Sequence, residues 1–313
     1  MRRVFVVLSL LAGCAAPEVD LERSGLLACD LVADEPCEAD GVCAAGRCYR
    51  PQEQPRVEIL SPEVPAFARY EPGAGQIPVV LRVVSNADLQ SDDEADAVGP
   101  LGALEVVVDG EIVDTIDGGD PSSGMDVPIS LANTPGVHRI SVQLLQPDGT
   151  PYDNDAARAR LVYFVTEDDR AYVAITRPWP GDAIPGSTQQ VAVEVQTFNF
   201  DIVPAGLRPL EDMGHVHLHY GDDVTSCWRE RACDARAAAI VDRAEDNGVG
   251  TGIALFPSTG VEQTTLGAVL RNADHGPYLV PFAECSVLQP PASCDVITDT
   301  IEIRRTAEPS PQP

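Results

Sequence analysis

Gly214-His215-Val216-His217-Leu218-His219-Tyr220 alternates imidazoles with apolar side chains, and this period of two predicts a β-strand. In an extended strand, side chains two positions apart share a face. The apolar side chains of the stretch should therefore pack into a core, while the three imidazoles lie together on the outward face. Neutral imidazole is a common metal ligand, so this outward face is a candidate metal site.

Short apolar runs recur along the rest of the chain, separated by turns rich in Gly and Pro. Sustained helical periodicity is rare, which favours an all-β fold. The expected strands form two groups of six, which fit two immunoglobulin-like β-sandwiches in tandem, residues 57–166 and 171–305. The first group comprises Arg56–Leu60, Ile77–Val84, Leu104–Val108, Val127–Leu131, His138–Leu145 and Ala159–Val165. The second comprises Tyr172–Thr176, Gln189–Phe200, His215–Tyr220, Thr251–Phe256, Thr265–Leu270 and Val296–Ile303.

The two expected sandwiches form a divergent internal repeat. Asp148-Gly149-Thr150-Pro151-Tyr152 aligns with Asp274-His275-Gly276-Pro277-Tyr278, each after an apolar run expected at strand F of the immunoglobulin-like topology. Gly102–Val108 aligns in the same way with the opening stretch, as strand C. The histidines stand opposite other residue types, since His215, His217, His219 and His275 correspond to Ala103, Glu105, Val107 and Gly149. The scaffold therefore does not need these histidines in order to fold.

Three of the histidines should converge at one rim of the second sandwich. Strands C and F are antiparallel neighbours, so the start of C, with His215 and His217, lies beside the end of F, which His275 follows. Alternate strand residues are roughly 6.5–7 Å apart, a gap that two imidazoles can close around one ion. His219 is roughly 13 Å from His215 by the same rise, so it is left outside the ligand set. The nearest carboxylates, as a fourth ligand or as partners of the imidazoles, are Asp274, Asp212 and Glu211.

Two other interpretations of the histidines stay open. Imidazoles on an outward strand face cost little, so the cluster could be incidental. Clustered imidazoles also lower one another's pKa, so the cluster could be a pH-sensing patch. The distant His275 and the absence of these histidines from the sister sandwich favour the metal site. The ligand type indicates copper or zinc as the ion.

The second sandwich also carries two motifs of a known family. Gly214-His215-Val216-His217 with the following Asp222, together with Arg271–Tyr278, resembles a bacterial family of extracellular Ig-like domains with a G-H-x-H…D motif and a later N-x-D-H-x-P turn. That family is largely of unknown function, so the resemblance implies the fold and the clustered histidines but no activity. The chain departs from the family by an insertion, 227–250, with a helix-like run at Asp234–Arg243. The insertion would cap the site or cover a sheet edge.

The N-terminal residues have the pattern of an export signal. Met1-Arg2-Arg3 precedes an apolar run, Val4–Leu11, that is too short to span a bilayer. The run ends in Leu11-Ala12-Gly13-Cys14, which resembles the lipobox of bacterial lipoproteins. The resemblance implies removal of residues 1–13 and lipidation of Cys14, and Ala15 as the second mature residue implies sorting to the outer membrane. We therefore expect a lipid-anchored protein of the cell envelope, either periplasmic or exposed at the surface.

Cysteines also indicate an exported chain. A tether, 14–28, leads to a Cys-rich module, 29–50, which is too small to build a core, so disulfides are expected in its place. Its cysteines are Cys29, Cys37, Cys43 and Cys48. A zinc knuckle is the weaker alternative, because their spacing lacks C-x2-C pairs. The remaining cysteines are Cys227, Cys233, Cys285 and Cys294, for which we expect pairing within each cluster, with a cross-link between the clusters as the alternative. An extended linker, 51–56, and a disordered tail, 306–313, complete the organisation.

Composition excludes several classes of function. The formal net charge is −28, and removal of residues 1–13 with Arg2 and Arg3 changes it to −30, which excludes nucleic acid as a partner. All basic residues are arginines, so there is no ε-amine for Schiff-base or phosphate-loop chemistry, and no nucleophile elbow or zinc-protease motif is present. The sequence predicts a non-enzymatic surface lipoprotein whose second sandwich binds a transition metal. The alternative is an adhesion or assembly module that binds a protein or a glycan.

Overall fold

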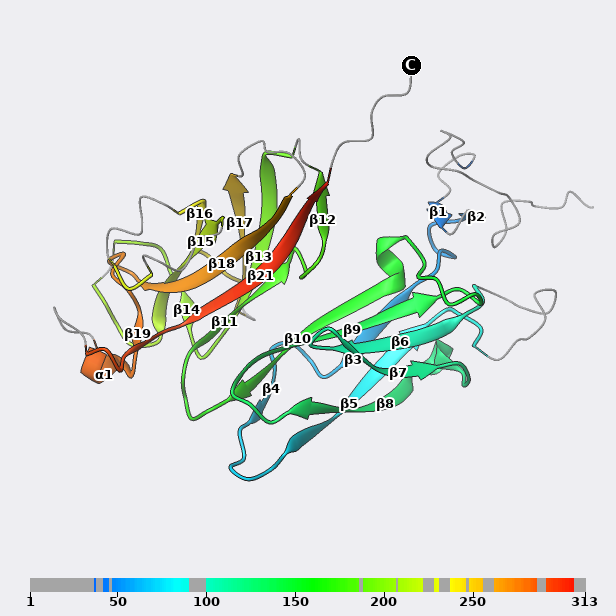
Figure 1. The fold of residues 1–313 in the computed structure, drawn as a ribbon, viewed down its shortest axis with the longest axis horizontal. Coiled ribbons are helices and arrows are strands. Elements are labelled where there is room, and N and C mark those ends of the chain that lie inside the picture. The colour runs from blue at the N-terminus through cyan, green and yellow to red at the C-terminus, as the bar shows by residue number, and fades with distance from the viewer. Residues whose placement is uncertain are drawn as a thin grey trace, which may run out of the picture.

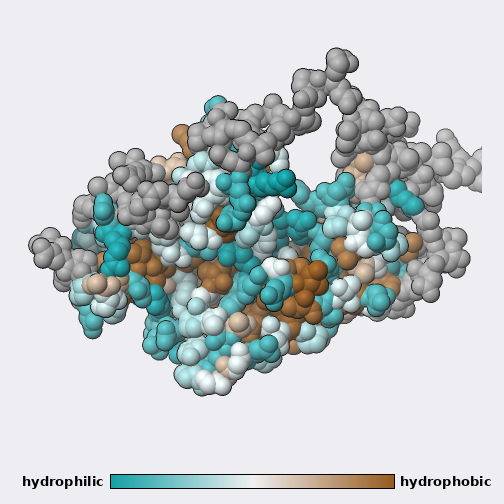
Figure 2. Space-filling model, viewed as in Figure 1, coloured by the Kyte–Doolittle hydropathy of each residue, from teal (hydrophilic) through white to brown (hydrophobic). Residues whose placement is uncertain are grey.

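The computed structural model describes residues 37, 42–44, 47–89, 100–185, 188–206, 208–221, 228–230, 237–245, 248–255, 262–285 and 291–306. In these ranges the fold is all-β, as expected, and its one α-helix, α1 (Phe282–Cys285), is a single turn. Two β-sandwiches lie side by side (Figure 1). No helix in the described ranges is long and apolar enough to cross a membrane. Most of the face in Figure 2 is hydrophilic, interrupted by separate apolar patches.

The first sandwich packs a three-stranded sheet against a five-stranded sheet. Its strands are β3 (Val57–Ser61), β4 (Ala66–Arg69), β5 (Gln76–Ser85), β6 (Ala103–Val108), β7 (Glu111–Ile116), β8 (Met125–Ala132), β9 (Gly136–Leu145) and β10 (Arg158–Thr166). The orders are β3-β5-β8 and β4-β10-β9-β6-β7. Alternate residues such as Leu81 and Val83 on β5 and Leu104 and Val106 on β6 form the shared core. The six expected runs left one or two short strands unlocated, and these are β4, which is short, and β7, which is exposed except at Ile116 and shows no alternation.

The second sandwich has the same two-layer design. Its strands are β11 (Tyr172–Arg177), β12 (Ala183–Pro185), β13 (Gln190–Phe198), β14 (Asp201–Ile202), β15 (Met213–Tyr220), β16 (Ala239–Val241), β17 (Val249–Leu255), β18 (Glu262–Asn272) and β21 (Thr298–Thr306). The sheet β11-β13-β17 faces the sheet β12-β21-β18-β15-β14, and β16 pairs with β15. A small hairpin of β19 (Leu279–Val280) and β20 (Asp295–Val296) follows at one end, next to α1.

Two expectations for this sandwich were wrong. The helix-like run at Asp234–Arg243 contains strand β16, which adds to the free edge of β15 by pairing Val216 with Val241 and Leu218 with Ala239. An open sheet edge offers unpaired backbone groups, and this pairing outweighs the weak helical pattern of the run. The tail was also expected one residue too early, from residue 306, since Thr306 still belongs to β21; residues 307–313 lie outside the described ranges.

The two sandwiches meet through the outer faces of their sheets. Phe164 on β10 and Tyr172 on β11 belong to one buried apolar cluster, and the tilted rings of Phe67 and Phe198 pack with centroids 4.6 Å apart. The buried carboxylate of Asp299 pairs with Arg139 of the first sandwich and accepts a 2.7 Å hydrogen bond from the Ile175 N–H. Apolar packing together with a buried ion pair fixes the two sandwiches against each other.

The Cys-rich module is a small hairpin that packs on the first sandwich. It contains β1 (Val42–Ala44) and β2 (Arg47–Tyr49), and Cys37 is bonded to Cys48. Cys43 is also disulfide-bonded, whereas Cys29 and Cys14 lie outside the described residues, as does the tether 14–28. Ala44 and Tyr49 join the core of the first sandwich. The module therefore extends a core that it cannot build by itself.

The linker expected at 51–56 is not extended. The N–H groups of Glu53 and Gln54 donate to the Arg50 carbonyl at 2.9 and 3.0 Å, which forms a compact turn. Asn86 and Asn154 then donate from their side-chain amides to backbone carbonyls of the turn, Asn154 to the Pro55 carbonyl at 2.7 Å. These side-chain bonds, which come from residues far along the sequence, hold the segment against the first sandwich.

One histidine of the first sandwich, the buried His138, pairs with a half-exposed carboxylate. His138 Nδ1 lies 2.7 Å from Asp109 Oδ2, and its Nε2 lies 3.0 Å from the Thr134 carbonyl. Both partners are acceptors, so the doubly protonated, charged ring is the form that satisfies both contacts. Burial lowers the pKa of His138, but the bonds to Asp109 and Thr134 more than compensate, and the net shift is upward. Burial raises the pKa of Asp109, but bonds from His138 and from the Arg139 N–H leave it below its ordinary value.

This pair should give the first sandwich a pH-dependent stability. The raised pKa of His138 contributes stability that is lost as the pH rises through it, and the lowered pKa of Asp109 contributes stability that is lost in acid. The contribution is therefore largest between roughly pH 4 and 6.5. We expect Asp109→Asn to remove about 0.5–1 kcal/mol there, because solvent screens the half-exposed carboxylate. Urea unfolding at several pH values measures this loss. The exposed Glu111→Gln on the same hairpin should leave the profile unchanged, and an unchanged profile in Asp109→Asn would contradict the assignment.

Candidate metal centre

The antiparallel pairing of β15 with β18 brings the three histidines together. His215 and His217 project from β15, and His215 lies opposite Arg271 near the end of β18. His275 follows β18 in a tight turn, in which its N–H donates to the Asn272 carbonyl at 2.9 Å. The start of β15 and the end of β18 thus share one rim of the sandwich (Figure 1), as expected for strands C and F.

The three imidazoles present one nitrogen each to a common point. His215 Nε2 lies 3.0 Å from His217 Nε2 and 3.2 Å from His275 Nδ1. His275 Nδ1 lies 3.3 Å from His217 Nε2. The three ring nitrogens form a nearly equilateral triangle, which we call the His triangle. In the described part of the chain, this is the group of side chains that could hold a metal ion.

The His triangle cannot be satisfied by hydrogen bonds among its own members. An imidazole nitrogen either carries a proton and donates, or carries a lone pair and accepts, but it does not do both. When three nitrogens are mutual neighbours, at least two are of the same kind, so at least one contact in the His triangle sets two donors or two acceptors against each other. A cation that receives all three lone pairs removes this conflict.

The turn that carries His275 repeats a turn of the first sandwich bond for bond. Asn272 N–H donates to the Gly276 carbonyl at 2.9 Å, and Gln146 N–H donates to the Thr150 carbonyl at 2.7 Å. Ala103 pairs with Leu145 as His215 pairs with Arg271, so the internal repeat is confirmed with the alignment expected from the sequence. His275 has a φ of 65°, and the equivalent Gly149 has a φ of 83°. A residue with a Cβ in this conformation carries backbone strain, which is common at functional positions.

The histidines are buried, not exposed as expected for an outward strand face. His215 and His217 are 0% exposed and His219 is 3% exposed. The alternation correctly separates two faces of β15, but it does not reveal that the second face is also covered. The cover is residues 228–230 of the insertion, where the buried Trp228 packs on Val269 and its ring centroid lies 6.3 Å from that of His219. The insertion thus covers the face with 228–230 and the sheet edge with β16.

Burial controls the protonation of the central histidine. Desolvation is the largest cause that lowers the pKa of His217, to about 2, and electrostatic interactions with His215, Arg271, His219 and His275 lower it further. His217 is therefore neutral throughout the physiological range, with one nitrogen lone pair available.

The remaining candidate ligands do not join the His triangle. Asp212 accepts a hydrogen bond from the Tyr278 hydroxyl at 3.0 Å, and Asp274 accepts one from the Gly276 N–H at 2.9 Å. Neither carboxylate belongs to the metal-capable group in the described residues, and neither does Glu211. His219 is also outside the group, as expected from the strand rise. Asp222 lies outside the described residues.

Arg271, which sequence analysis did not single out, contacts the candidate site. Its side chain is fully buried, and its guanidinium donates to the carbonyls of Trp228 at 2.9 Å, Glu230 at 2.8 Å and His275 at 3.0 Å. The signal was present in the repeat alignment, where an apolar residue, Leu145, stands at the equivalent position of the first sandwich.

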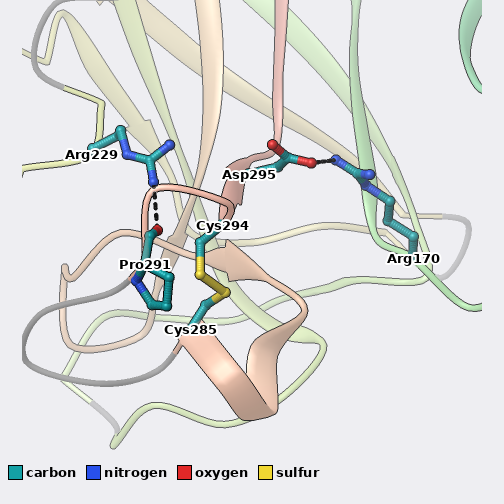
Figure 3. The surroundings of a disulfide bond; sticks show 6 residues. All are labelled: Arg170, Arg229, Cys285, Pro291, Cys294 and Asp295. Carbon is teal, nitrogen blue, oxygen red and sulfur yellow. Dashed lines mark hydrogen bonds and ion pairs between the residues drawn. A yellow bond between two sulfur atoms is a disulfide. The ribbon is translucent and has the colours of Figure 1, made fainter.

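A disulfide-closed loop lies beside the cover (Figure 3). Cys285 is bonded to Cys294, which confirms pairing within that cluster and excludes the cross-link for these two cysteines. Arg229 of the cover donates to the Pro291 carbonyl at 3.2 Å, and Asp295 pairs with Arg170 at 3.2 Å. Cys227 and Cys233 lie outside the described residues. The loop thus contacts the insertion through Arg229.

No protein-family model and no curated protein matches the chain. Among solved structures, it is similar to the Clostridium thermocellum CbhA fibronectin(III)-like modules, with 17% identity, a TM-score of 0.23, and coverage of 35% of this chain and 95% of that chain. It is also similar to Bacteroides uniformis beta-glucuronidase 3, with 12% identity and a TM-score of 0.27; 71% of this chain matches 24% of the glucuronidase. For Drosophila N-cadherin EC1-4, the values are 10% identity, a TM-score of 0.20, and coverage of 81% and 50%. These similarities concern β-sandwich domains and carry no information on activity.

Proposed function

We propose that the second sandwich binds one zinc or copper ion through His215, His217 and His275. The His triangle carries this proposal. Zinc–nitrogen bonds of 2.0–2.1 Å in tetrahedral geometry place ligand nitrogens about 3.3 Å apart. The observed separations are 3.0–3.3 Å, so an ion fits with only small shifts of the rings. Imidazole is a preferred ligand of both zinc and copper. Three protein ligands leave a fourth position for water or for a group from another molecule.

We further propose that the chain is a non-enzymatic lipoprotein of the cell envelope, anchored in the outer membrane by a lipid at Cys14. The lipobox Leu11–Cys14 and the disulfides of an exported chain support this location. Tandem immunoglobulin-like sandwiches fit a surface or adhesion-type module. A surface protein or a glycan is the partner class that such a module would bind.

Metal content tests the His triangle directly. The protein, purified without a His tag, is incubated with zinc or copper, dialysed, and analysed by mass spectrometry. We expect about one ion per chain in the wild type and close to none in His215→Ala/His217→Ala, because one imidazole does not hold an ion against dialysis. His219→Ala is the matched control, since His219 is also buried on β15 but lies outside the His triangle. Equal metal content in all three proteins would overturn the proposal and leave the adhesion or assembly module as the function.

A further inference from the structure

Arg271 places a permanent charge where the first sandwich has an apolar side chain. It lies on β18 opposite His215 and is 0% exposed, and its counterpart in the repeat is Leu145. A buried guanidinium is strongly unfavourable unless hydrogen bonds compensate the loss of water. The sandwich fold does not require this charge, as the first sandwich shows.

The guanidinium of Arg271 joins a histidine of the His triangle to the segment that covers it. One terminal nitrogen donates to the Trp228 carbonyl, and the other donates to the carbonyls of Glu230 and His275. The His275 carbonyl belongs to the same residue as one candidate ligand nitrogen, and the other two carbonyls belong to residues 228–230. The planar fork of an arginine fixes its partners in one geometry, which a lysine ammonium does not.

The cover has a second attachment on its outer side. Arg229 donates to the Pro291 carbonyl in the loop closed by Cys285 and Cys294 (Figure 3). Val296, which follows that loop, packs against Trp228 of the cover and Val269 of β18. It also packs against the disulfide. The cover is thus held between Arg271 beneath it and the disulfide-closed loop beside it.

Charge and position predict opposite effects of Arg271 on a bound cation. The positive charge of Arg271, buried opposite His215, disfavours a second positive charge in the site. The hydrogen bond to the His275 carbonyl favours the ion, because it holds the third ligand in place. The sign of the change on substitution therefore separates the two roles.

We propose that Arg271 is a positioning residue that couples metal binding at the His triangle to closure of residues 228–230 over it. This inference rests on the proposed metal site. The ion fixes the ring of His275, and Arg271 fixes both the backbone of His275 and the cover. Binding of the ion therefore stabilises the closed cover, and the closed cover stabilises binding of the ion. The cover in turn keeps water from the ligands, which strengthens their interaction with the ion.

Competition with a chromophoric chelator measures zinc affinity and shows whether substitution of Arg271 weakens or strengthens zinc binding. We expect Arg271→Gln, which removes the charge and the fork, to weaken zinc binding about tenfold or more, and Arg271→Lys, which keeps the charge, to weaken it to a similar extent. Arg305→Gln is the matched control, because Arg305 is also fully buried in this sheet but donates to the Thr188 carbonyl. Tighter binding by Arg271→Gln, or wild-type affinity in Arg271→Lys, would overturn the inference.

Trypsin cleavage after Arg229 gives a second readout that does not depend on the affinity itself. We expect zinc to slow this cleavage several-fold in the wild type and to have no such effect in Arg271→Gln, whose cover is also cleaved faster without zinc. Circular dichroism establishes that each variant is folded. Failure of the wild type to bind zinc would overturn the metal site, and the inference with it. Zinc binding by the wild type with zinc-independent cleavage would overturn the coupling alone.

Discussion

Saturating zinc should raise the melting temperature of the protein by roughly 8–16 °C, and His217→Leu should abolish this rise. A ligand at a thousand times its Kd stabilises the folded state by about 4 kcal/mol, and each kcal/mol shifts the melting temperature by about 2–4 °C in a domain of this size. The ion would bind only the folded chain, because β15 and the turn after β18 must pair before the His triangle exists. Differential scanning calorimetry with and without zinc measures the shift.

The same substitution should have the opposite sign in the metal-free protein. His217 is fully buried, and its Nε2 lies 3.0 Å from His215 Nε2 and 3.3 Å from His275 Nδ1, in a triangle whose three nitrogens cannot all satisfy one another by hydrogen bonds. Leucine has a similar volume and no polar atom, so His217→Leu should raise the metal-free free energy of unfolding by about 1–2 kcal/mol. If His217→Leu is more stable than the wild type without zinc and less stable than the wild type with zinc, His217 serves metal binding and not folding.

His219→Leu is the control for these opposite effects of His217→Leu on the metal-free and the zinc-loaded protein. His219 lies on the same face of β15 and is also buried, but it takes no part in the His triangle. Its substitution should shift the melting temperature equally with and without zinc. If His217→Leu instead lowered the stability of the metal-free protein as much as that of the zinc-loaded protein, the histidines would be structural and the metal site would be wrong.

The convergence of the histidines could be predicted because it depends only on the periodicity of one strand and on which strand pairs with it. The period of two places His215 and His217 on one face, and the repeat alignment identifies β15 and β18 as adjacent antiparallel strands. The alignment holds to the residue, since the turn at His275 has the hydrogen bonds of the turn at Gly149. Backbone geometry therefore determined this part of the site, and it follows from sequence spacing.

The environment of the histidines could not be predicted in this way. Periodicity separates the faces of a strand but does not show what lies over each face. The cover depends on bonds from Arg271 to carbonyls of Trp228 and Glu230, some forty residues earlier in the chain, and backbone carbonyls leave no mark in a sequence. Strands of two or three residues, such as β14 and β16, were missed because they are too short to show a period.

The repeat also exposes a steric requirement at the start of strand C. A Cβ on Gly214 would lie 1.9 Å from the Arg271 carbonyl oxygen and 3.1 Å from Phe200 Cζ. At the equivalent position of the first sandwich, a Cβ on Gly102 would lie 1.8 Å from the Leu145 carbonyl oxygen. The obstacle in both places is backbone of the neighbouring strand, which no side-chain rotation can relieve. Glycine at this position is thus a condition of the close approach of strands C and F in both sandwiches.

Gly214→Ala should therefore destabilise the second sandwich by at least about 3 kcal/mol and also weaken zinc binding. The added methyl group must push β15 away from β18 at Gly214, one residue from His215, so the distance between His215 and His275 increases. Urea unfolding and zinc titration measure the two effects. Gly102→Ala introduces an equal overlap in a sandwich without the histidines, so it should cost similar stability and leave zinc affinity unchanged. Gly75→Ala, where a Cβ meets nothing within 4 Å, should change neither. If Gly214→Ala lost stability but kept wild-type zinc affinity, the ligands could not depend on the pairing of β15 with β18, and the His triangle would not be the site.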